Sequence, residues 1–369
     1  MIPNLLVPIV NRTNYTKLRP VILRLKECND IEVKIVLSSG IVPRNLTDAA
    51  ENIYEDNVDI INELDCMLFN DTLESMVKSL GISLIEHATV FAKQKPNGLL
   101  VVGDRYDMLG PVLSAKIMNL PIFHIQGGES SGTIDDTVRD LITRCSIRHY
   151  TSTMKSCEEV KRIVGDQGVF YTGCPSVESF VNIKISDALH VEKFRKHFKD
   201  NFDLKPKESY FIIISHPNTT DPEDINMGCL LDAAISFGLK CIVLHPNIDA
   251  YREQISKDIR RYKNQVICIS HAPIEDFVQL MAHSSCMIGN SSAGIREAAS
   301  FMVPVVNVGK RQDGRERNNN TFDVTCDYEK IKNTIMLALS SSPSGENIYY
   351  KKGSIDFISE NIIEYLLEK

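Results

Sequence analysis

Short apolar runs alternate along the chain with longer stretches in which apolar residues recur at helical spacing. The runs in the first half are LLVPIV, VKIVLS, GLLVVG, IFHIQ and HYTST, and those in the second half are YFIIIS, KCIVLHP, QVICIS, CMIGN and PVVNV. Continuous apolar runs of this length are typical of strands buried on both faces of a parallel sheet, with crossover helices between them. The pattern predicts an α/β protein made of βαβ units.

The chain has 369 residues, more than one hydrophobic core usually organises, so we expect two domains. The charged stretch VEKFRKHFKDNFDLKPKES separates the two groups of runs. We therefore predict Rossmann-like domains at 1–180 and 181–350, both doubly wound, and a terminal helix at 351–369 that packs back on the first domain. The sequence GSIDF at its start predicts a Ser or Asp cap. Because open α/β sheets bind ligands at the carboxyl ends of their strands, we expect one cleft between the domains.

Composition and charge limit the classes of binding partner that we expect. Hydrophobic residues make up 43% of the chain and charged residues 24%, which is ordinary globular composition. The net charge of -7 gives no general attraction to nucleic acid. No run reaches the roughly 20 apolar residues that span a bilayer, so we expect no membrane partner. The ten cysteines form no CxxC pair, which favours free thiols and a cytoplasmic location.

The segment CMIGNSSAGIREAASF predicts a phosphate site. It has the pattern of a strand, then GNSSAG, then a helix from about Ala293. Backbone N–H groups at a helix start favour an anion, and Ser291 and Ser292 can add hydroxyl donors. Glu297 can accept hydrogen bonds from the hydroxyls of a ribose. Alternatively, GNSS is only a helix cap.

Basic and histidine residues follow other strands of the second half. Lys310, Arg311, Arg315 and Arg317 form a cluster suited to a diphosphate, although a charge run of this kind is often only a solvated loop. Further candidates at strand ends are His216, His245, Asn247 and His271, any of which can instead be structural.

Carboxylates and arginines follow three strands of the first half. Arg12 comes after the first strand, and Asp104 and Arg105 follow another. The segment HIQGGESSGTIDDTVRD adds a third group, which consists of Gln126, Glu129, Asp135, Asp136 and Arg139. Carboxylates brought together in a cleft can divide acid and base work, or can simply pair with the arginines as a structural network.

The chain resembles the hydrolysing UDP-N-acetylglucosamine 2-epimerases of sialic acid biosynthesis. The motifs that carry the resemblance are NRTNYTKLRP, GDRYD, HIQGGESSGTIDDTVRDLIT, GCPS, NIDA, GNSSAGIREAASF and GKRQDGRE, in unbroken order from about residue 5. The resemblance implies a GT-B fold and no metal or nicotinamide cofactor. It also implies conversion of UDP-N-acetylglucosamine and water to N-acetylmannosamine and UDP, by elimination to a glycal and hydration with inversion at C2. The same resemblance implies a homodimer or homotetramer.

The resemblance also implies roles for single residues. It assigns catalysis to Asp104 and Asp135. It assigns substrate binding to Arg12, His216, Ser291, Ser292, Glu297 and Arg311. The family's remaining catalytic carboxylate usually belongs to a Glu two residues after the histidine of HIEGGE, and here that position is Gln126.

A Gln can neither take nor give a proton at neutral pH. Three explanations remain open. Proton transfer passes to Asp104, Glu129 or Asp135 while Gln126 orients the substrate; the enzyme acts on a modified sugar such as UDP-2,4-diacetamido-2,4,6-trideoxyglucose; or its activity is weak.

Four other functions compete with this hypothesis. A glycosyltransferase of the same fold would share the diphosphate site, but the GGESSGTIDD turn argues against it. A non-hydrolysing 2-epimerase is closer, although SGTIDD and NSSAGIRE favour the hydrolysing branch. A non-catalytic UDP-sugar binding protein is favoured only by Gln126. A dinucleotide dehydrogenase is disfavoured because no GxGxxG follows the first strand.

Overall fold

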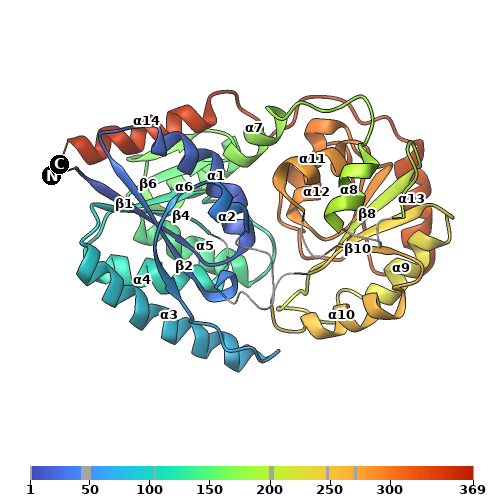
Figure 1. Cartoon of the computed structure of the whole chain (residues 1–369), viewed down its shortest axis with the longest axis horizontal. Helices are drawn as coiled ribbons and strands as arrows, with labels where there is room; N and C mark the ends of the chain where they lie inside the picture. Colours follow the sequence, from blue (N-terminus) through green and yellow to red (C-terminus); the bar gives the residue numbers. More distant parts are fainter. Residues whose placement is uncertain are drawn as a thin grey trace. The chain divides into compact units, whose positions relative to one another are not determined.

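The computed structural model describes residues 2–42, 51–103, 105–198, 203–246, 249–269 and 272–368. The chain divides into two compact units. Unit 1 consists of Met1–Glu129, Ile134–Ser179 and Tyr349–Lys369, and unit 2 of Ser130–Thr133 and Phe180–Ile348. Each unit has its own sheet with helices on both faces (Figure 1). The predicted α/β class with two doubly wound sheets is confirmed.

Within the described residues, unit 1 has one parallel sheet of seven strands in the order β3-β2-β1-β4-β5-β6-β7. The strands are β1 (Asn4–Ile9), β2 (Glu32–Ser38), β3 (Asp59–Leu64), β4 (Gly98–Val102), β5 (Ile122–Ile125), β6 (Arg148–Thr151) and β7 (Val169–Tyr171). β2 and β3 lie on one side of β1, and β4 to β7 lie on the other side. The connections therefore change direction between β1 and β4. Such a switch point opens a crevice at the carboxyl ends of the strands.

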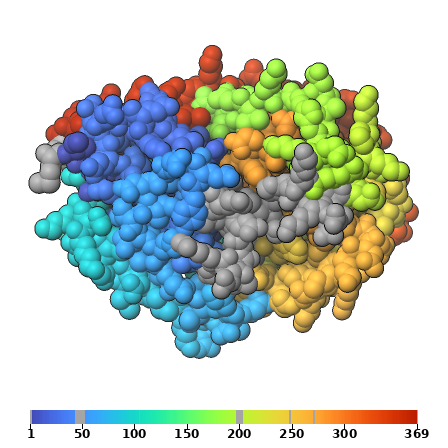
Figure 2. Space-filling view, in the orientation of Figure 1, coloured from blue at the N-terminus to red at the C-terminus, as the bar shows by residue number. Residues whose placement is uncertain are grey.

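The helices of unit 1 connect these strands. They are α1 (Arg12–Lys26), α2 (Glu51–Glu55), α3 (Leu73–Gln94), α4 (Leu109–Ile117), α5 (Ile134–Cys145), α6 (Met154–Val164), α7 (Pro175–Val181), where the chain passes to unit 2, and α14 (Ser354–Leu367), with short 3-10 turns η1 (Ser39–Ile41) and η3 (Tyr106–Met108). Helix α3 lies at the surface of the unit (Figure 2). Among the described residues, no helix has an apolar stretch long enough to cross a bilayer.

Unit 2 repeats the same topology. Within the described residues its parallel sheet has six strands in the order β10-β9-β8-β11-β12-β13, so the switch point lies between β8 and β11. The strands are β8 (Tyr210–Ile214), β9 (Lys240–Leu244), β10 (Ile267–Ile269), β11 (Cys286–Gly289), β12 (Val305–Val308) and β13 (Thr321–Val324). The helices are α8 (Val191–Phe198), α9 (Met227–Ile235), α10 (Arg252–Arg261), α11 (Ile274–Ala282), α12 (Ser292–Arg296) and α13 (Tyr328–Ser340), with a 3-10 turn η5 (Ala298–Phe301).

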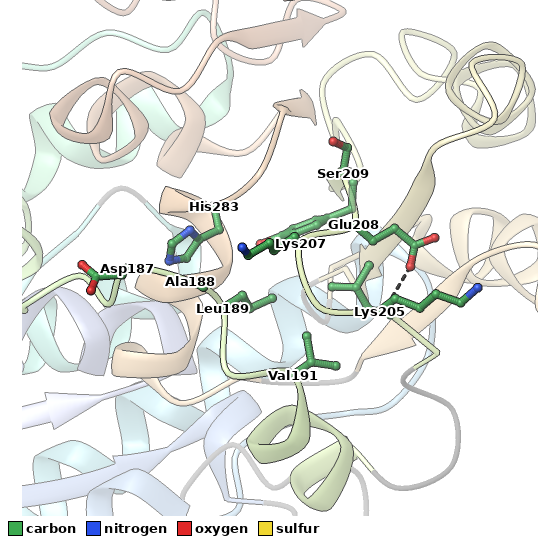
Figure 3. A pocket seen from close by; sticks show the side chains of 11 residues that line it. Asp187, Ala188, Leu189, Val191, Lys205, Lys207, Glu208, Ser209 and His283 are labelled. Atoms are coloured by element: carbon green, nitrogen blue, oxygen red, sulfur yellow. Dashed lines mark hydrogen bonds between the residues drawn. The ribbon is translucent and has the colours of Figure 1, made fainter.

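A cavity of about 250 Å³ lies at the amino edge of the unit 2 sheet, where Tyr210 begins β8 (Figure 3). Its lining includes Lys205, Lys207, Asp187 and Glu208, so the formal charges of these four side chains cancel. The carboxylate of Glu208 accepts a hydrogen bond from the backbone N–H of Lys205 at 2.8 Å. This cavity lies at the edge opposite to the switch-point crevice, and we do not assign the reaction to it.

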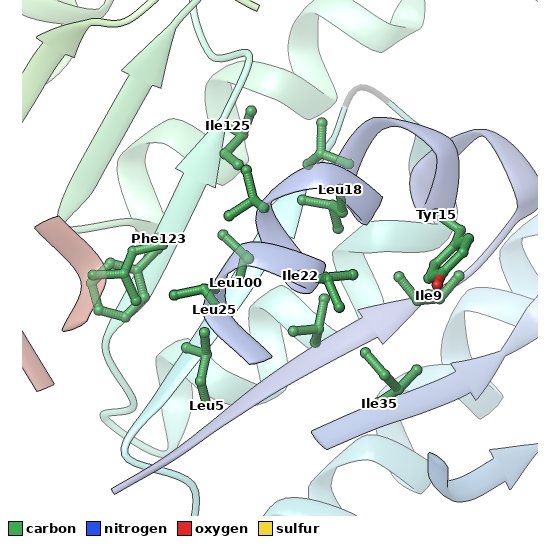
Figure 4. Close-up of a cluster of buried hydrophobic side chains, with 14 of the residues drawn as sticks. Leu5, Ile9, Tyr15, Leu18, Ile22, Leu25, Ile35, Leu100, Phe123 and Ile125 are labelled. Carbon is green, nitrogen blue, oxygen red and sulfur yellow. The ribbon is translucent and has the colours of Figure 1, made fainter. Parts of the chain in front are cut away.

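The hydrophobic core of unit 1 has two layers because the side chains of β1 alternate between the faces of the sheet. Leu5, Val7 and Ile9 belong to the cluster formed with α1 and α14 (Figure 4). Leu6 and Val10 belong to the cluster formed with α3, α4 and α5. All five are fully buried, and burying each such side chain stabilises the fold by about 1.5–3 kcal/mol.

Helix α14 packs on α1 within unit 1, but its predicted cap is wrong. The residue before the helix is Gly353, with φ +81°, and no side chain of the first turn caps it. Instead the carboxylate of Glu178 accepts hydrogen bonds from the backbone N–H groups of Gly353 at 2.5 Å and Ile355 at 2.8 Å. A distant acceptor on α7 therefore replaces the local Ser or Asp cap.

All ten cysteines lie in described segments and are free thiols, as predicted. Burial raises the pKa of the Cys241 and Cys286 thiols to about 12. These thiols stay protonated at neutral pH and pack as small apolar side chains.

Candidate active site

The crevice of unit 1 lies between the loops that follow β1 and β4. Arg12 is the first residue of α1, and the side chain of Asn11 caps that helix by accepting a hydrogen bond from the N–H of Asn14 at 2.9 Å. From the other loop, Arg105 donates to Oδ2 of the buried Asp107 at 3.1 Å, and Asn11 donates to the same oxygen at 3.5 Å. Asp107 thus joins the two loops and sets their spacing.

Arg12 is suited to an anionic ligand. Burial lowers the pKa of its guanidinium from the ordinary value. A cation withdrawn from water in this way gains more from an anion that reaches it than an exposed cation does. Asp104, the first candidate acid or base, lies outside the described residues, as do Asn247 and His271.

Gln126 stands at the exit of β5 in a rare backbone conformation, with φ +66°. Its backbone N–H donates to the carbonyl of Tyr150 at 2.9 Å, and its side-chain Nε2 donates to Sγ of Cys174 at 3.2 Å. Cys174 Sγ is also 3.2 Å from the hydroxyl of Ser176. All three side chains are buried. The side-chain amide of Gln126 therefore connects the turn to the GCPS segment. This role is structural, because an amide cannot transfer a proton at neutral pH.

The glycines after Gln126 are required by the tight path of the turn. Gly128 has φ +76°, and a Cβ atom there would lie 2.1 Å from the carbonyl oxygen of Ser156. Only glycine can occupy that position without moving the backbone. The turn then presents Glu129, whose side chain is largely buried.

Arg139 connects this turn to α5. Its guanidinium is 1% exposed and donates to the backbone carbonyl of Glu129 and, at 2.9 Å, to Oδ1 of Asp136. Arg139 thus has a structural role within unit 1, and its predicted contact with substrate stays a prediction. Its neighbour Asp135 is half-buried in the first turn of α5, where the helix dipole favours the ionised carboxylate.

The crevice of unit 2 lies between the loops that follow β8 and β11. His216 follows β8 and is largely buried. After β11 comes Asn290, then Ser291, whose hydroxyl caps α12 by accepting from the N–H of Ala293 at 3.3 Å. The helix begins at Ser292, next to the predicted position. It is only five residues long, so its dipole is small, and anion binding must depend on individual donors.

The far end of α12 is Glu297, which is 4% exposed and has Oε1 3.9 Å from Nη2 of Arg296. Of the predicted cation cluster, Arg311 lies nearest to the GNSS turn, because its Nη1 donates to the carbonyl of Asn290 at 3.1 Å. Arg317 instead pairs with Asp323 at 2.9 Å. Arg311 therefore lies at the turn, whereas Arg317 has a structural partner.

Sequence reasoning missed four polar residues that connect loops within their own unit, namely Asn11 and Asp107 in unit 1 and Asn290 and Gln312 in unit 2. Asn11 before a helix is a recognisable cap signal, and Asn290 belongs to the GNSS motif. Asp107 and Gln312 carry no local signal. In the described part of the chain, no three His, Cys, Asp or Glu side chains gather closely enough to hold a metal ion.

Comparison with known proteins matches this chain to sugar-nucleotide epimerases. The family described as UDP-N-acetylglucosamine 2-epimerase matches residues 23–366. The UDP-N,N'-diacetylbacillosamine 2-epimerase (hydrolyzing) of Legionella pneumophila is 31% identical over 345 residues, which cover 92% of this chain and 90% of that protein. The GDP/UDP-N,N'-diacetylbacillosamine 2-epimerase (hydrolyzing) of Campylobacter jejuni is 28% identical over 281 residues, or 72% of this chain and 69% of that protein.

The fold has counterparts among solved structures. The crystal structure of UDP-GlcNAc 2-epimerase from Neisseria meningitidis bound to UDP-GlcNAc has a TM-score of 0.78 to this chain at 18% identity, covering 99% of this chain and 100% of that one. Together with the two parallel sheets, this similarity shows the GT-B fold.

Proposed function

The chain belongs to the UDP-N-acetylglucosamine 2-epimerase family and is an enzyme of that kind, and from this premise we propose that it is a hydrolysing UDP-sugar 2-epimerase. Its substrate in this proposal is UDP-N,N'-diacetylbacillosamine, which is UDP-2,4-diacetamido-2,4,6-trideoxyglucose. The observation that carries the proposal is the 31% identity, over 92% of the chain, to a hydrolysing enzyme named for that substrate.

UDP-N-acetylglucosamine is the second candidate substrate. The family description and a relative of Neisseria meningitidis that is 24% identical over 336 residues carry that sugar in their names. The two candidate sugars differ at C4 and C6, away from the reacting carbons C1 and C2. The same chemistry therefore applies to both.

The proposed reaction has two steps. A base removes the proton at C2, the electrons of that C–H bond form a C1=C2 double bond, and UDP departs with the electrons of the C1–O bond. Water then adds its oxygen to C1 of the glycal and gives one proton to a base, while an acid delivers a proton to C2. This proton arrives on the face opposite to the one that lost the first proton, which inverts C2. Each proton transfer needs a side chain that can act as an acid or a base within hydrogen-bonding reach of its atom.

We assign the proton transfers to the carboxylates of unit 1, which are Asp104, Glu129 and Asp135. Gln126 takes the role of holding the turn, because its amide is bonded to Cys174 and cannot act as an acid or base. The largely buried position of Glu129 and the place of Asp135 in the first turn of α5 support a division into acid and base.

We assign the UDP group to the carboxyl edge of unit 2. Ser291 and Ser292 supply hydroxyl donors, and Arg311 supplies a guanidinium that pairs with the diphosphate. His216 adds a further donor to the diphosphate, and Glu297 accepts from the ribose hydroxyls. In unit 1, Arg12 contributes positive charge at the crevice.

The decisive experiment incubates the enzyme with each UDP-sugar in deuterated water. The proposal requires free UDP and free sugar in equal amounts, and one solvent deuteron at C2 of the released sugar. A UDP-sugar product without free UDP would instead identify a non-hydrolysing epimerase. A higher kcat/KM for UDP-N-acetylglucosamine than for the diacetamido sugar would reject the substrate assignment alone.

We also propose that the chain forms a homo-oligomer through α3. The outer face of this helix carries Leu73, Val77 and Ile85, which are 47%, 69% and 64% exposed, with the exposed Gly81 between them. Residues four apart lie on one helix face, and an exposed apolar stripe favours a protein contact. Size-exclusion chromatography with light scattering should give the native chain a mass above that of the monomer. The Val77→Lys variant should have a mass closer to that of the monomer.

A further inference from the structure

A buried asparagine spans the switch point of unit 2. Asn290 directly follows β11 and is 0% exposed. Its side-chain Oδ1 accepts from the backbone N–H of His216 at 2.7 Å, and its Nδ2 donates to the carbonyl of the same residue at 2.8 Å. Two parallel strands make bonds of this kind through their backbones. Here a side chain extends the pairing of β8 and β11 beyond the ends of both strands.

The backbone of Asn290 is held as firmly as its side chain. Its N–H donates to the carbonyl of Ile214 at 3.1 Å. Its carbonyl accepts from Nη1 of Arg311 at 3.1 Å and from Nε2 of Gln312 at 2.9 Å. Asn290 thus joins the loops that follow β8, β11 and β12 in one hydrogen-bonded network.

The orientation of the Gln312 side chain follows from its partner. Because the carbonyl of Asn290 can only accept, the NH₂ group of Gln312 must face it, and Oε1 must point elsewhere. Gln312 is 2% exposed, and within the described residues its Oε1 has no hydrogen-bond partner. The carbonyl of Asn290 is therefore held by donors on the neighbouring loop, at the cost of a buried acceptor left without a bond.

Two donors on one carbonyl also fix the next peptide group. In a trans peptide the C=O and the following N–H point in opposite directions. The bonds from Arg311 and Gln312 therefore set the direction of the Ser291 N–H, while the bonds to His216 set the distance between the two loops. His216 and Ser291, whose positions are set in this way, are residues to which the proposed function assigns the diphosphate.

We propose that Asn290 is a positioning residue for UDP. It acts through its neighbours, by holding His216 and Ser291 in the one geometry in which both engage the same diphosphate. This inference rests on the proposed assignment of UDP to unit 2. The diphosphate contacts positioned by Asn290 stabilise the bound substrate and the transition state equally. Loss of the Asn290 side chain should therefore raise KM and leave kcat nearly unchanged.

The test measures UDP affinity by calorimetry, KM and kcat by sugar release, and Tm by thermal denaturation. Asn290→Ala removes both side-chain bonds to His216, and we expect UDP binding on the order of 10- to 100-fold weaker, with KM raised by a similar factor. kcat at saturating substrate should change by less than about 3-fold.

Asn320 offers a matched control at the opposite edge of the same sheet. It is 1% exposed, precedes β13, and donates through Nδ2 to the carbonyl of Val303 at 2.7 Å. Asn320→Ala removes a comparable buried amide and should lower Tm to a similar extent. UDP affinity should stay at the native value in this variant.

Asn290→Asp keeps the size of the side chain, so it tests the inference even if Asn290→Ala does not fold. At neutral pH the introduced carboxylate faces the carbonyl of His216 without a proton to donate. When protonated, it can donate to that carbonyl again, and burial favours the protonated form. UDP affinity relative to the native chain should therefore be low at pH 8 and recover as the pH falls toward 5.5, while Asn290→Ala shows no recovery.

Two results would overturn these ideas separately. If the native chain binds UDP and both Asn290 variants bind it with native affinity, the positioning role is rejected and the proposed function stands. If the native chain does not bind UDP at all, the assignment of UDP to unit 2 fails, and the positioning role fails with it.

Discussion

The two carboxyl edges have the same topology but different chemistry. At the edge of unit 1, the carboxylates include Glu129, on the turn in which Gln126 has positive φ, and Asp135, in the first turn of α5. At the edge of unit 2, the loops around the switch point carry amides, hydroxyls and a guanidinium, among them Asn290, Ser291 and Arg311.

This difference suits unit 1 to proton transfer and unit 2 to ligand binding. Carboxyl groups exchange protons near neutral pH, whereas amides, hydroxyls and guanidinium groups keep their protonation state and hold a ligand. The same doubly wound sheet can therefore serve proton transfer in one unit and diphosphate binding in the other. Substitutions in unit 1 should lower kcat, and substitutions in unit 2 should raise KM.

The largest expected effect is that of Asp135→Asn, which removes a group that can exchange a proton and keeps its shape. We expect kcat for sugar release to fall on the order of 10²-fold or more with KM nearly unchanged. Asp140→Asn, on the same helix, is the control and should leave kcat at the native value. A loss seen only in KM would make Asp135 a binding residue and weaken the comparison.

The next largest effect is that of Gly128→Ala. The added Cβ would lie 2.1 Å from the carbonyl of Ser156 at φ +76°, so the turn must move at a cost of at least about 3 kcal/mol. Gly353 has φ +81° in the left-handed α region and nothing within 4 Å of an added Cβ, so Gly353→Ala should cost only about 1–2 kcal/mol. Denaturant unfolding measures both. Equal losses would show that backbone strain alone, without the steric contact, explains them.

Buried histidines make unit 1 sensitive to acid. Burial lowers the pKa of His87 and of His149 to about 4, below the ordinary value near 6.5 of the unfolded chain. Between these two values the unfolded state binds more protons, so stability is complete above about pH 6.5 and is lost as the pH falls toward 4.

The expected loss at pH 5 is about 2 kcal/mol for each of the two histidines. The free energy of unfolding, measured from pH 7 to pH 5, should show this slope in the native chain. His87→Gln should have a shallower slope than the native chain. An unchanged slope would mean that His87 does not contribute to the acid sensitivity.

The smallest effect is that of Arg311→Lys in unit 2. A lysine keeps the charge but loses the planar fork of donors, so we expect UDP to bind on the order of 10-fold more weakly with kcat unchanged. Arg260→Lys, on an exposed face of α10, is the control and should leave UDP affinity unchanged. A fall in kcat without a change in affinity would contradict the division of labour between the units.

The interior strands and the edge strand β10 could be predicted from the sequence, whereas the other edge strands of the described sheets could not. All ten predicted runs form strands, and central strands such as β4 and β8 are buried along their whole length. The strands β3, β7 and β13 were not predicted. They lie at the edges of their sheets and are mostly half-exposed. Edge strands often carry polar residues on their open side, and β3, β7 and β13 accordingly show no continuous apolar run.

The sequence by itself determined the α/β class, ten of the strands and the motifs that identify the family, because burial and strand spacing leave a local pattern of apolar residues. Tertiary structure decided which polar groups meet. Gln126 bonds to a thiol 48 residues away, Asn290 to a backbone 74 residues away, and the N–H of Gly353 to a carboxylate 175 residues away. A hydrogen bond depends on the position and direction of both partners, and over such separations these are set only when the sheets are assembled.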